Sequence, residues 1–178
     1  MKFNVKFLVR QAVIASIYAV LTIAMGEFAY GPIQFRYSEV MTLLAFFNPQ
    51  YVSGLTIGCL ISNLFSPFGM LDVIVGTLCT LIVVIIMSKL KNIFIASIIP
   101  SLQAPVIGLM IYLMSGRTEN FLLMSIKIFA SEIIAVSFLG IILFRFLLKN
   151  KYFVEVFDLD KSKVSYLNKF LTTNKKEI

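Results

Sequence analysis

The feature that most constrains the fold of this sequence is a series of long apolar runs separated by short polar breaks. Of the 178 residues, 59% are hydrophobic and only 14% are charged, whereas a soluble domain carries about a quarter charged residues. So little charge cannot cover the surface of an ordinary water-soluble domain. The sequence therefore predicts an all-α integral membrane protein, because helices satisfy their own backbone hydrogen bonds in lipid.

The apolar runs predict six transmembrane helices. Their ranges are about 11–29, 38–48, 51–66, 70–88, 93–115 and 121–148. The second run rises only about 16 Å, half of a bilayer core. Short or broken helices are tolerated where their backbone faces protein or a polar cavity, and they point to a binding site. We expect one membrane domain, residues 1–148, followed by a polar cytoplasmic tail, residues 149–178.

The basic residues predict how the chain is oriented. The net charge is +7, and most Lys and Arg residues gather near the two chain ends and at 89–91. By the positive-inside rule, both termini then lie in the cytoplasm and the protein lies in the cell membrane. A nucleic-acid-binding protein would spread its positive charge over one face, so no nucleic-acid partner is expected. The tail either lies on the anionic inner leaflet or extends into solvent.

The sequence contains no residue pattern typical of an enzyme or a metal site. It has no His, and Cys59 and Cys79 lie in apolar runs without CxxC spacing. It has no GxSxG motif, no adjacent pair of glutamates, and no GxxxxGKS or GxxxxGKT segment that would bind ATP. We therefore expect no enzyme activity and no cofactor bound by this chain.

Ionisable side chains near or inside the apolar runs are the first candidates for ligand binding, because an uncompensated charge in hydrocarbon costs several kcal/mol. They are Arg36, Glu39, Asp72, Lys127 and Glu132. Alternatives stay open for three of them: Asp72 could cap a helix N-terminus, and Arg36 could pair with Glu39 or with lipid phosphate. Lys127 and Glu132 are five residues apart, so they do not share a helix face.

Amide and aromatic residues complete the candidate site. Asn63 and Gln103 offer paired donor and acceptor atoms for the edge of a heterocycle, although hydrogen bonds between helices would explain them equally. Phe35 and Tyr37 belong to the first outer loop, about 26–37, which forms either an interfacial aromatic belt or a lid over a flat ligand. These residue types fit a planar, donor-rich small molecule better than an inorganic ion.

Rows of small residues predict close contacts between helices. Ala15 and Ala19 lie four residues apart in the first run, as do Gly54, Gly58 and Ser62 in the third. This spacing lets helix backbones approach one another in lipid. The rows either pack this chain's own helices together or form a docking face for another membrane subunit.

Three segments closely resemble the QueT family. They are GPIQFRYSE at 31–39, GLTIGCLISNL at 54–64 and GMLDVIVGT at 69–77, and the resemblance extends over about residues 11–148. Proteins of that family are substrate-binding S components of energy-coupling factor (ECF) transporters and import queuosine precursors. The resemblance implies a bundle of six helices, a transmembrane coupling protein as partner, and two ATPase subunits that use ATP.

The resemblance also implies roles for individual residues. It implies that Ala15 and Ala19 meet the coupling protein. It places five residues in an outer-leaflet pocket: Arg36, Glu39, Asn63, Asp72 and Glu132. The segment PSLQAP at 100–105 departs from the family pattern, which leaves the exact ligand open.

The expected function is capture of a queuosine precursor, queuine or a related 7-deazaguanine base, by the membrane subunit of an ECF-type ABC importer. An S component for a different vitamin and a stand-alone small-molecule carrier are the alternatives.

Overall fold

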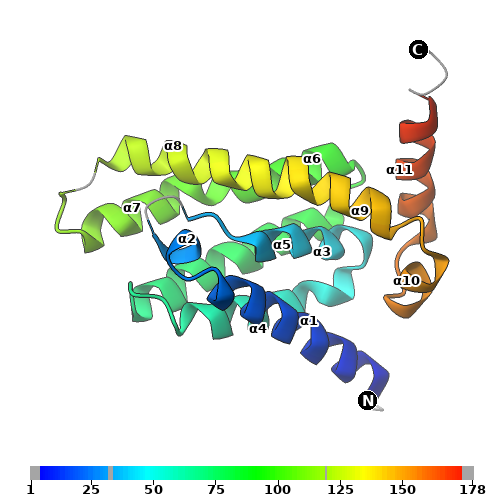
Figure 1. Ribbon diagram of the computed structural model, residues 1–178, viewed down its shortest axis with the longest axis horizontal. Coiled ribbons are helices and arrows are strands. Elements are labelled where there is room, and N and C mark those ends of the chain that lie inside the picture. The colour runs from blue at the N-terminus through cyan, green and yellow to red at the C-terminus, as the bar shows by residue number, and fades with distance from the viewer. Residues whose placement is uncertain (1–4, 32–33, 119, 174–178) are drawn as a thin grey trace.

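A computed structural model of the chain describes residues 5–31, 34–118 and 120–173, and every regular element in these ranges is helical (Figure 1). The α-helices are α1 (Val5–Ala24), α2 (Glu27–Tyr30), α3 (Leu43–Phe47), α4 (Val52–Asn63), α5 (Thr77–Lys89), α6 (Ile93–Ile98), α7 (Ala104–Met114), α8 (Phe121–Glu132), α9 (Ile141–Leu147), α10 (Lys151–Val156) and α11 (Lys161–Thr173). The 3-10 helices are η1 (Tyr37–Thr42), η2 (Pro49–Tyr51) and η4 (Ile99–Gln103), and the π-helices are η3 (Asp72–Gly76) and η5 (Ile133–Gly140). The predicted all-α class is confirmed for these residues.

Four helical stretches in the described ranges are long and apolar enough to cross a membrane. They are Val5–Ala24, Asp72–Lys89, Ile93–Met114 and Phe121–Leu147. The predicted second and third runs form two shorter helices, Tyr37–Phe47 and α4. The 12 residues of α4 rise about 18 Å, so this helix alone does not span a bilayer core of about 30 Å.

The first helix ends earlier than the apolar run that encodes it. We predicted a helix to about residue 29, but α1 ends at Ala24, and the short α2 follows after a turn. Gly26 has a φ of 51°, a left-handed conformation that glycine adopts without steric cost. The turn at Gly26 redirects the chain toward the loop that holds Gln34 and Arg36.

The two rows of small residues pack α1 against α4. Ala15 and Ala19 are each 5% exposed, and a Cβ on Gly58 would lie 2.8 Å from the Ala15 carbonyl oxygen and from the Tyr18 Cβ. The two helices can approach this closely because residue 58 is glycine. In this chain alone the rows pack its own helices together, and docking of Ala15 and Ala19 on another membrane subunit stays a prediction.

The segment after residue 148 differs from the prediction of a polar tail lying on the membrane or in solvent. Its helices α10 and α11 lie across the end of the bundle at which α1 begins (Figure 1). Four of its apolar side chains join the main hydrophobic core: Val154, Leu159, Val164 and Leu167. The apolar side of this amphipathic segment is thus buried against the bundle. Residues 174–178 of the predicted tail lie outside the described residues.

Candidate functional site

A polar cavity lies between the helices. It is lined by Gln34, Arg36, Glu39, Asp72, Gly76, Thr80, Gln103, Ile107, Ile128 and Glu132. Its empty volume is about 310 Å³ including its opening, but only about 20 Å³ is open to the centre of a water molecule. One water needs about 10–15 Å³ by this measure. The cavity therefore has room for only one or two waters as it stands, and a ring-sized ligand requires its walls to move.

The helices around the cavity leave regular α-helical geometry at or next to four of the polar residues that line it. Glu39 lies in the 3-10 helix η1, and Asp72 begins the π-helix η3. Gln103 ends the 3-10 helix η4, and Glu132 directly precedes the π-helix η5. Turns of these types are common at functional sites, because they change the direction in which side chains project. Here they accompany four polar side chains from four segments that meet in one cavity.

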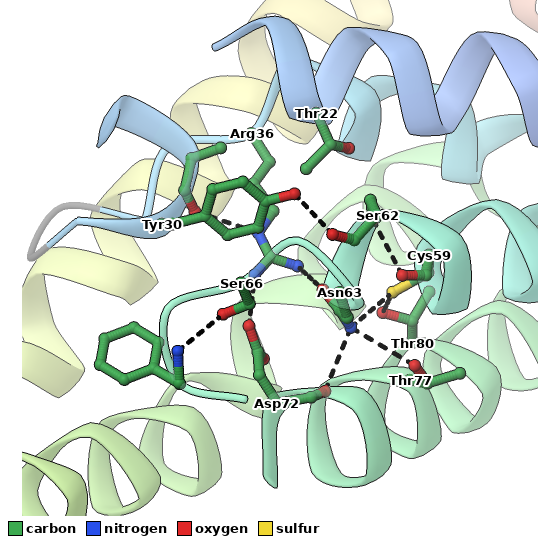
Figure 2. Close-up of polar contacts among 12 residues, drawn as sticks. Thr22, Tyr30, Arg36, Cys59, Ser62, Asn63, Ser66, Asp72, Thr77 and Thr80 are labelled. Carbon is green, nitrogen blue, oxygen red and sulfur yellow. Dashed lines mark hydrogen bonds and ion pairs between the residues drawn. The ribbon is translucent and has the colours of Figure 1, made fainter. Parts of the chain in front are cut away.

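Arg36 is the centre of a buried hydrogen-bond network on one wall of the cavity (Figure 2). Its Nη2 lies 3.3 Å from Asp72 Oδ2, and its Nη1 donates to Asn63 Oδ1 at 3.1 Å. Its Nε donates to the Ala29 carbonyl oxygen at 3.2 Å, and the guanidinium carbon lies 5.5 Å from the centre of the Tyr30 ring. Both charged side chains are buried, so removing either partner would leave an uncompensated charge in the interior.

Asn63 binds both members of this ion pair, Arg36 through its side chain and Asp72 through its backbone. Its Nδ2 donates to the Asp72 carbonyl oxygen at 3.2 Å and to Thr77 Oγ1 at 3.3 Å, which ties α4 to the π-helix η3 (Figure 2). A Cβ on Gly76 would lie 2.6 Å from Asp72 Oδ1 and 2.9 Å from Asn63 Nδ2. Glycine at this position therefore makes room for both side chains.

Two alternatives considered for these charged residues are wrong. The Asp72 side chain makes no capping bond at the start of η3, and instead faces Arg36. Arg36 pairs with Asp72 rather than with Glu39 three residues away, and Glu39 accepts its hydrogen bond from Tyr18.

The two glutamates of the cavity differ from Asp72 in having no ion-pair partner among the described residues. Glu39 Oε1 accepts from the Tyr18 hydroxyl at 2.6 Å, whereas Glu132 Oε1 accepts only a long 3.5 Å bond from Gln103 Nε2. Glu39 is 2% exposed and Glu132 is 5% exposed.

Four buried polar atoms of this cavity have no hydrogen-bond partner among the described residues. They are Gln34 Nε2, Glu39 Oε2, Asp72 Oδ1 and Glu132 Oε2. Buried polar atoms are nearly always paired in native proteins, and each exception requires an explanation. All four atoms belong to residues that line the cavity, and three acceptors and one donor in its walls indicate a site for a polar molecule.

The structure brings only part of the predicted set together. Arg36, Glu39, Asp72, Gln103 and Glu132 line the cavity, and Asn63 lies behind its wall.

Lys127, Phe35 and Tyr37 do not line the cavity. Ile128 and Glu132 are four residues apart and share the cavity face of α8, so Lys127 projects about 100° away from that face. Phe35 and Tyr37 form an edge-to-face pair with ring centres 5.1 Å apart, and Tyr37 is 49% exposed.

Sequence reasoning missed three polar residues of the site: Tyr18, Gln34 and Thr80. Thr80 had a readable signal, because Asp72, Gly76 and Thr80 are spaced four residues apart and share one helix face. Gln34 lies two residues before Arg36 in the chain, but its φ of 53°, uncommon for a residue other than glycine, was not predictable. Nothing in the sequence distinguishes Tyr18 from an ordinary core tyrosine.

An apolar helical bundle with a buried, charged and incompletely paired cavity defines a multi-pass membrane protein with a site for a small polar molecule. Comparison with known proteins then specifies the family. The family model described as QueT transporter matches residues 8–149, and the chain belongs to this family of transporters. The resemblance recognised in three sequence segments is thereby confirmed, and membership of a transporter family implies transport rather than catalysis.

A curated relative supports the same assignment over part of the chain. The Queuosine precursor transporter QueT of Lactococcus lactis subsp. cremoris (strain MG1363) is 51% identical over 73 residues, which cover 40% of this chain and 43% of the relative. The alignment thus spans less than half of the relative's length. No solved structure matches the chain.

Proposed function

We propose that this protein is the substrate-binding membrane subunit of an ECF-type ABC importer and that it captures a queuosine precursor, queuine or a related 7-deazaguanine base. The observation that carries the proposal is the group of four unpartnered polar atoms in one buried cavity. Membership of the QueT transporter family and the name of the curated relative support this choice of substrate.

The free atoms of the cavity complement a 7-deazaguanine ring. The ring presents an N–H and an exocyclic amine side by side, which carboxylate oxygens accept in charge-assisted hydrogen bonds. Glu39, Asp72 and Glu132 each have a free carboxylate oxygen for this edge. The ring also carries a carbonyl oxygen, and the free Nε2 of Gln34 is a donor for it.

Capture of a ring requires a conformational change, because the cavity has room for only one or two waters. Gln34 and Arg36 belong both to the loop of about 26–37 and to the cavity wall, so movement of this loop would change the cavity directly. The lid predicted from the sequence also contains residues 32–33, which lie outside the described residues.

The proposed orientation places both termini in the cytoplasm of the cell and the cavity in the outer half of the cell membrane, as the positive-inside rule favours. Six membrane segments then include the short helices Tyr37–Phe47 and α4. The chain contains no GxxxxGKS or GxxxxGKT segment, so a transmembrane coupling protein and two ATPase subunits would supply the ATP hydrolysis. Docking through Ala15 and Ala19 would require both side chains, each 5% exposed here, to become accessible to the partner.

Mass spectrometry of small molecules released from the purified protein tests the proposal. We expect a 7-deazaguanine base, and we expect queuine to compete for the site when riboflavin, thiamine and biotin do not. Release of one of those vitamins would favour an S component of different specificity. Uptake into liposomes that contain this chain alone, without ATPase partners, would favour a stand-alone carrier.

A further inference from the structure

The cavity carries an imbalance of charge that ring recognition alone does not explain. Three carboxyl groups line it, from Glu39, Asp72 and Glu132, and Arg36 supplies the only cationic side chain among its described lining residues. Arg36 lies 3.3 Å from Asp72, so this pair neutralises itself. Among the described residues, two carboxyl groups are left with no cation lining the same space.

Burial makes this imbalance costly. Glu39 and Glu132 are almost completely buried, and an ionised carboxylate taken out of water without a counter-charge costs several kcal/mol. The missing positive charge must then arrive with the ligand, or the carboxyl group must hold a proton. These two possibilities predict different ligands, because a neutral carboxylic acid lacks the ion-pair attraction with which an ionised carboxylate holds a cation.

Glu132 is the carboxyl group with the weakest protein partner. Tyr18 holds one oxygen of Glu39 through a 2.6 Å hydrogen bond, whereas Glu132 has only the 3.5 Å contact with Gln103. Ile107 and Ile128 also line the cavity, and charge pairs are stronger beside such low-dielectric walls than in water. Lys127, the nearest basic residue in the sequence, lies outside the cavity lining.

We infer that the cavity selects queuosine precursors whose substituent at C7 of the ring carries a cationic amine, and that Glu132 binds this amine. The inference rests on the proposed function and adds to it the charge of the ligand and the residue that recognises that charge. Glu39, Asp72 and Gln34 are then left for the edges of the ring.

Two probes with the same ring test the charge of the ligand on the unmodified full chain. These are 7-aminomethyl-7-deazaguanine, which is a cation at neutral pH, and 7-cyano-7-deazaguanine, which is neutral. By calorimetry on the purified protein we expect the amine to bind about tenfold or more tightly, the worth of one charge-assisted hydrogen bond. Equal affinities, or tighter binding of the nitrile, would overturn the inference while leaving the proposed function intact. Failure of the folded protein to bind either probe would overturn both.

Variants test the assignment to Glu132. We expect Glu132→Gln to weaken binding of the amine by about tenfold or more and to change binding of the nitrile by less than about threefold. Glu132→Asp, which keeps the charge, should keep the preference for the amine. Glu155→Gln makes the same chemical change on an exposed side chain of α10 and should bind both probes as the unmodified protein does. Equal weakening of both probes by Glu132→Gln would assign Glu132 to the ring and contradict the inference.

Discussion

Two regions of the protein that bury polar side chains differ in how completely those side chains are paired. One region is the cavity. The other is the tail interface, where residues 151–167 pack against α3 and η2. In the tail interface, Asn48 Nδ2 donates to the Asp158 carbonyl oxygen at 2.8 Å, and the Tyr51 hydroxyl donates to the Phe157 carbonyl oxygen at 2.6 Å. In the cavity, four polar atoms have no described partner.

The tail interface also supplies hydrogen-bond partners for the end of the short helix Tyr37–Phe47, whose last part is α3. Lys163 Nζ donates to the Phe46 carbonyl oxygen at 2.6 Å, and the Asp160 amide donates to the Phe47 carbonyl oxygen at 3.1 Å. The last carbonyl groups of any helix lack partners within it, and α3 ends inside the protein. Residues far along the chain therefore cap this helix.

The difference in pairing distinguishes polar groups that stabilise the fold from polar groups that are available to bind a ligand. Paired polar groups hold the tail to the bundle, whereas unpaired ones leave hydrogen-bonding capacity for a ligand. The ion pair of Arg36 and Asp72 lies in the cavity, and yet it is one of the pairs that stabilise the fold. A fifth unpaired atom, Gln11 Nε2, belongs to neither region; the other amide atom of Gln11 accepts from the Gly54 amide at 2.8 Å.

The largest expected effect comes from the structural pair inside the cavity. We expect Arg36→Met to destabilise the protein by about 3–5 kcal/mol, because Asp72 would be left as a buried charge without its partner. Thermal or chemical unfolding of the purified protein in detergent measures this change. The double variant Arg36→Met with Asp72→Asn should recover part of the loss, since no single charge is left behind. An unchanged unfolding transition in Arg36→Met would show that the pair does not hold the fold.

A smaller effect is expected at the tail interface. Lys163→Met removes the donor to the Phe46 carbonyl oxygen, and leaving that buried group unpaired should cost about 1–3 kcal/mol with ligand affinity unchanged. The exposed neighbour Lys161 provides the control, since Lys161→Met should leave the unfolding transition in place. Calorimetry of ligand binding, combined with the unfolding measurement, shows whether a variant changes ligand affinity or only stability. Loss of ligand binding by folded Lys163→Met would show that the tail interface also takes part in ligand binding, contrary to this prediction.

The N-terminus of α11 should contribute about 1 kcal/mol. Asp160 Oδ1 accepts from the Ser162 hydroxyl at 2.6 Å and from its amide at 2.8 Å. These bonds lower the pKa of Asp160 below its ordinary value. Asp160→Ala should therefore loosen the tail by about the worth of one N-cap, detected as faster proteolysis within residues 149–173.

The lowered pKa of Asp160 also predicts a pH dependence. A carboxyl group whose folded-state pKa is depressed stabilises the fold above its unfolded pKa, and this stabilisation is lost as the pH falls through the folded-state value. Proteolysis of the tail by an acid-active protease should therefore accelerate below about pH 4. Asp160→Asn keeps a capping side chain without a titrating group, so the acceleration should be weaker; equal acceleration would assign it to another group.

The smallest effect on stability is expected at Glu132. Glu132→Gln replaces a buried carboxyl group that has only a long hydrogen bond among the described residues, so the free energy of unfolding should stay within about 1 kcal/mol of its original value or rise. The same unfolding measurement, with Glu155→Gln as reference, checks this. A destabilisation as large as that of Lys163→Met would mean that Glu132 is a structural residue like those of the tail interface.

The sequence by itself determined the class of protein, the positions of its helical runs and most of the charged residues of the cavity. These properties are local. A low charge content excludes an ordinary soluble core, hydropathy marks the helices, and an ionisable residue within an apolar run is expensive wherever that run is placed. The shortness of Tyr37–Phe47 and of α4 was also apparent from the positions of polar residues and prolines.

Only the tertiary structure decided which polar groups are partners. Arg36 could reach Glu39 along the chain, but it binds Asp72, 36 residues away, because the packing of α4 and η3 brings that carboxylate closer. The same packing leaves Lys127 outside the cavity lining and places Tyr18 against Glu39.

The tail shows the same limit of local information. Its spacing of apolar residues indicated that one side requires cover, but membrane, solvent and protein contact were not distinguishable from that pattern. Burial of Val154, Leu159, Val164 and Leu167 in the main core answers the question. A sequence shows which groups would destabilise the fold if they were buried without a partner. The positions of distant segments in space determine what pairs with them.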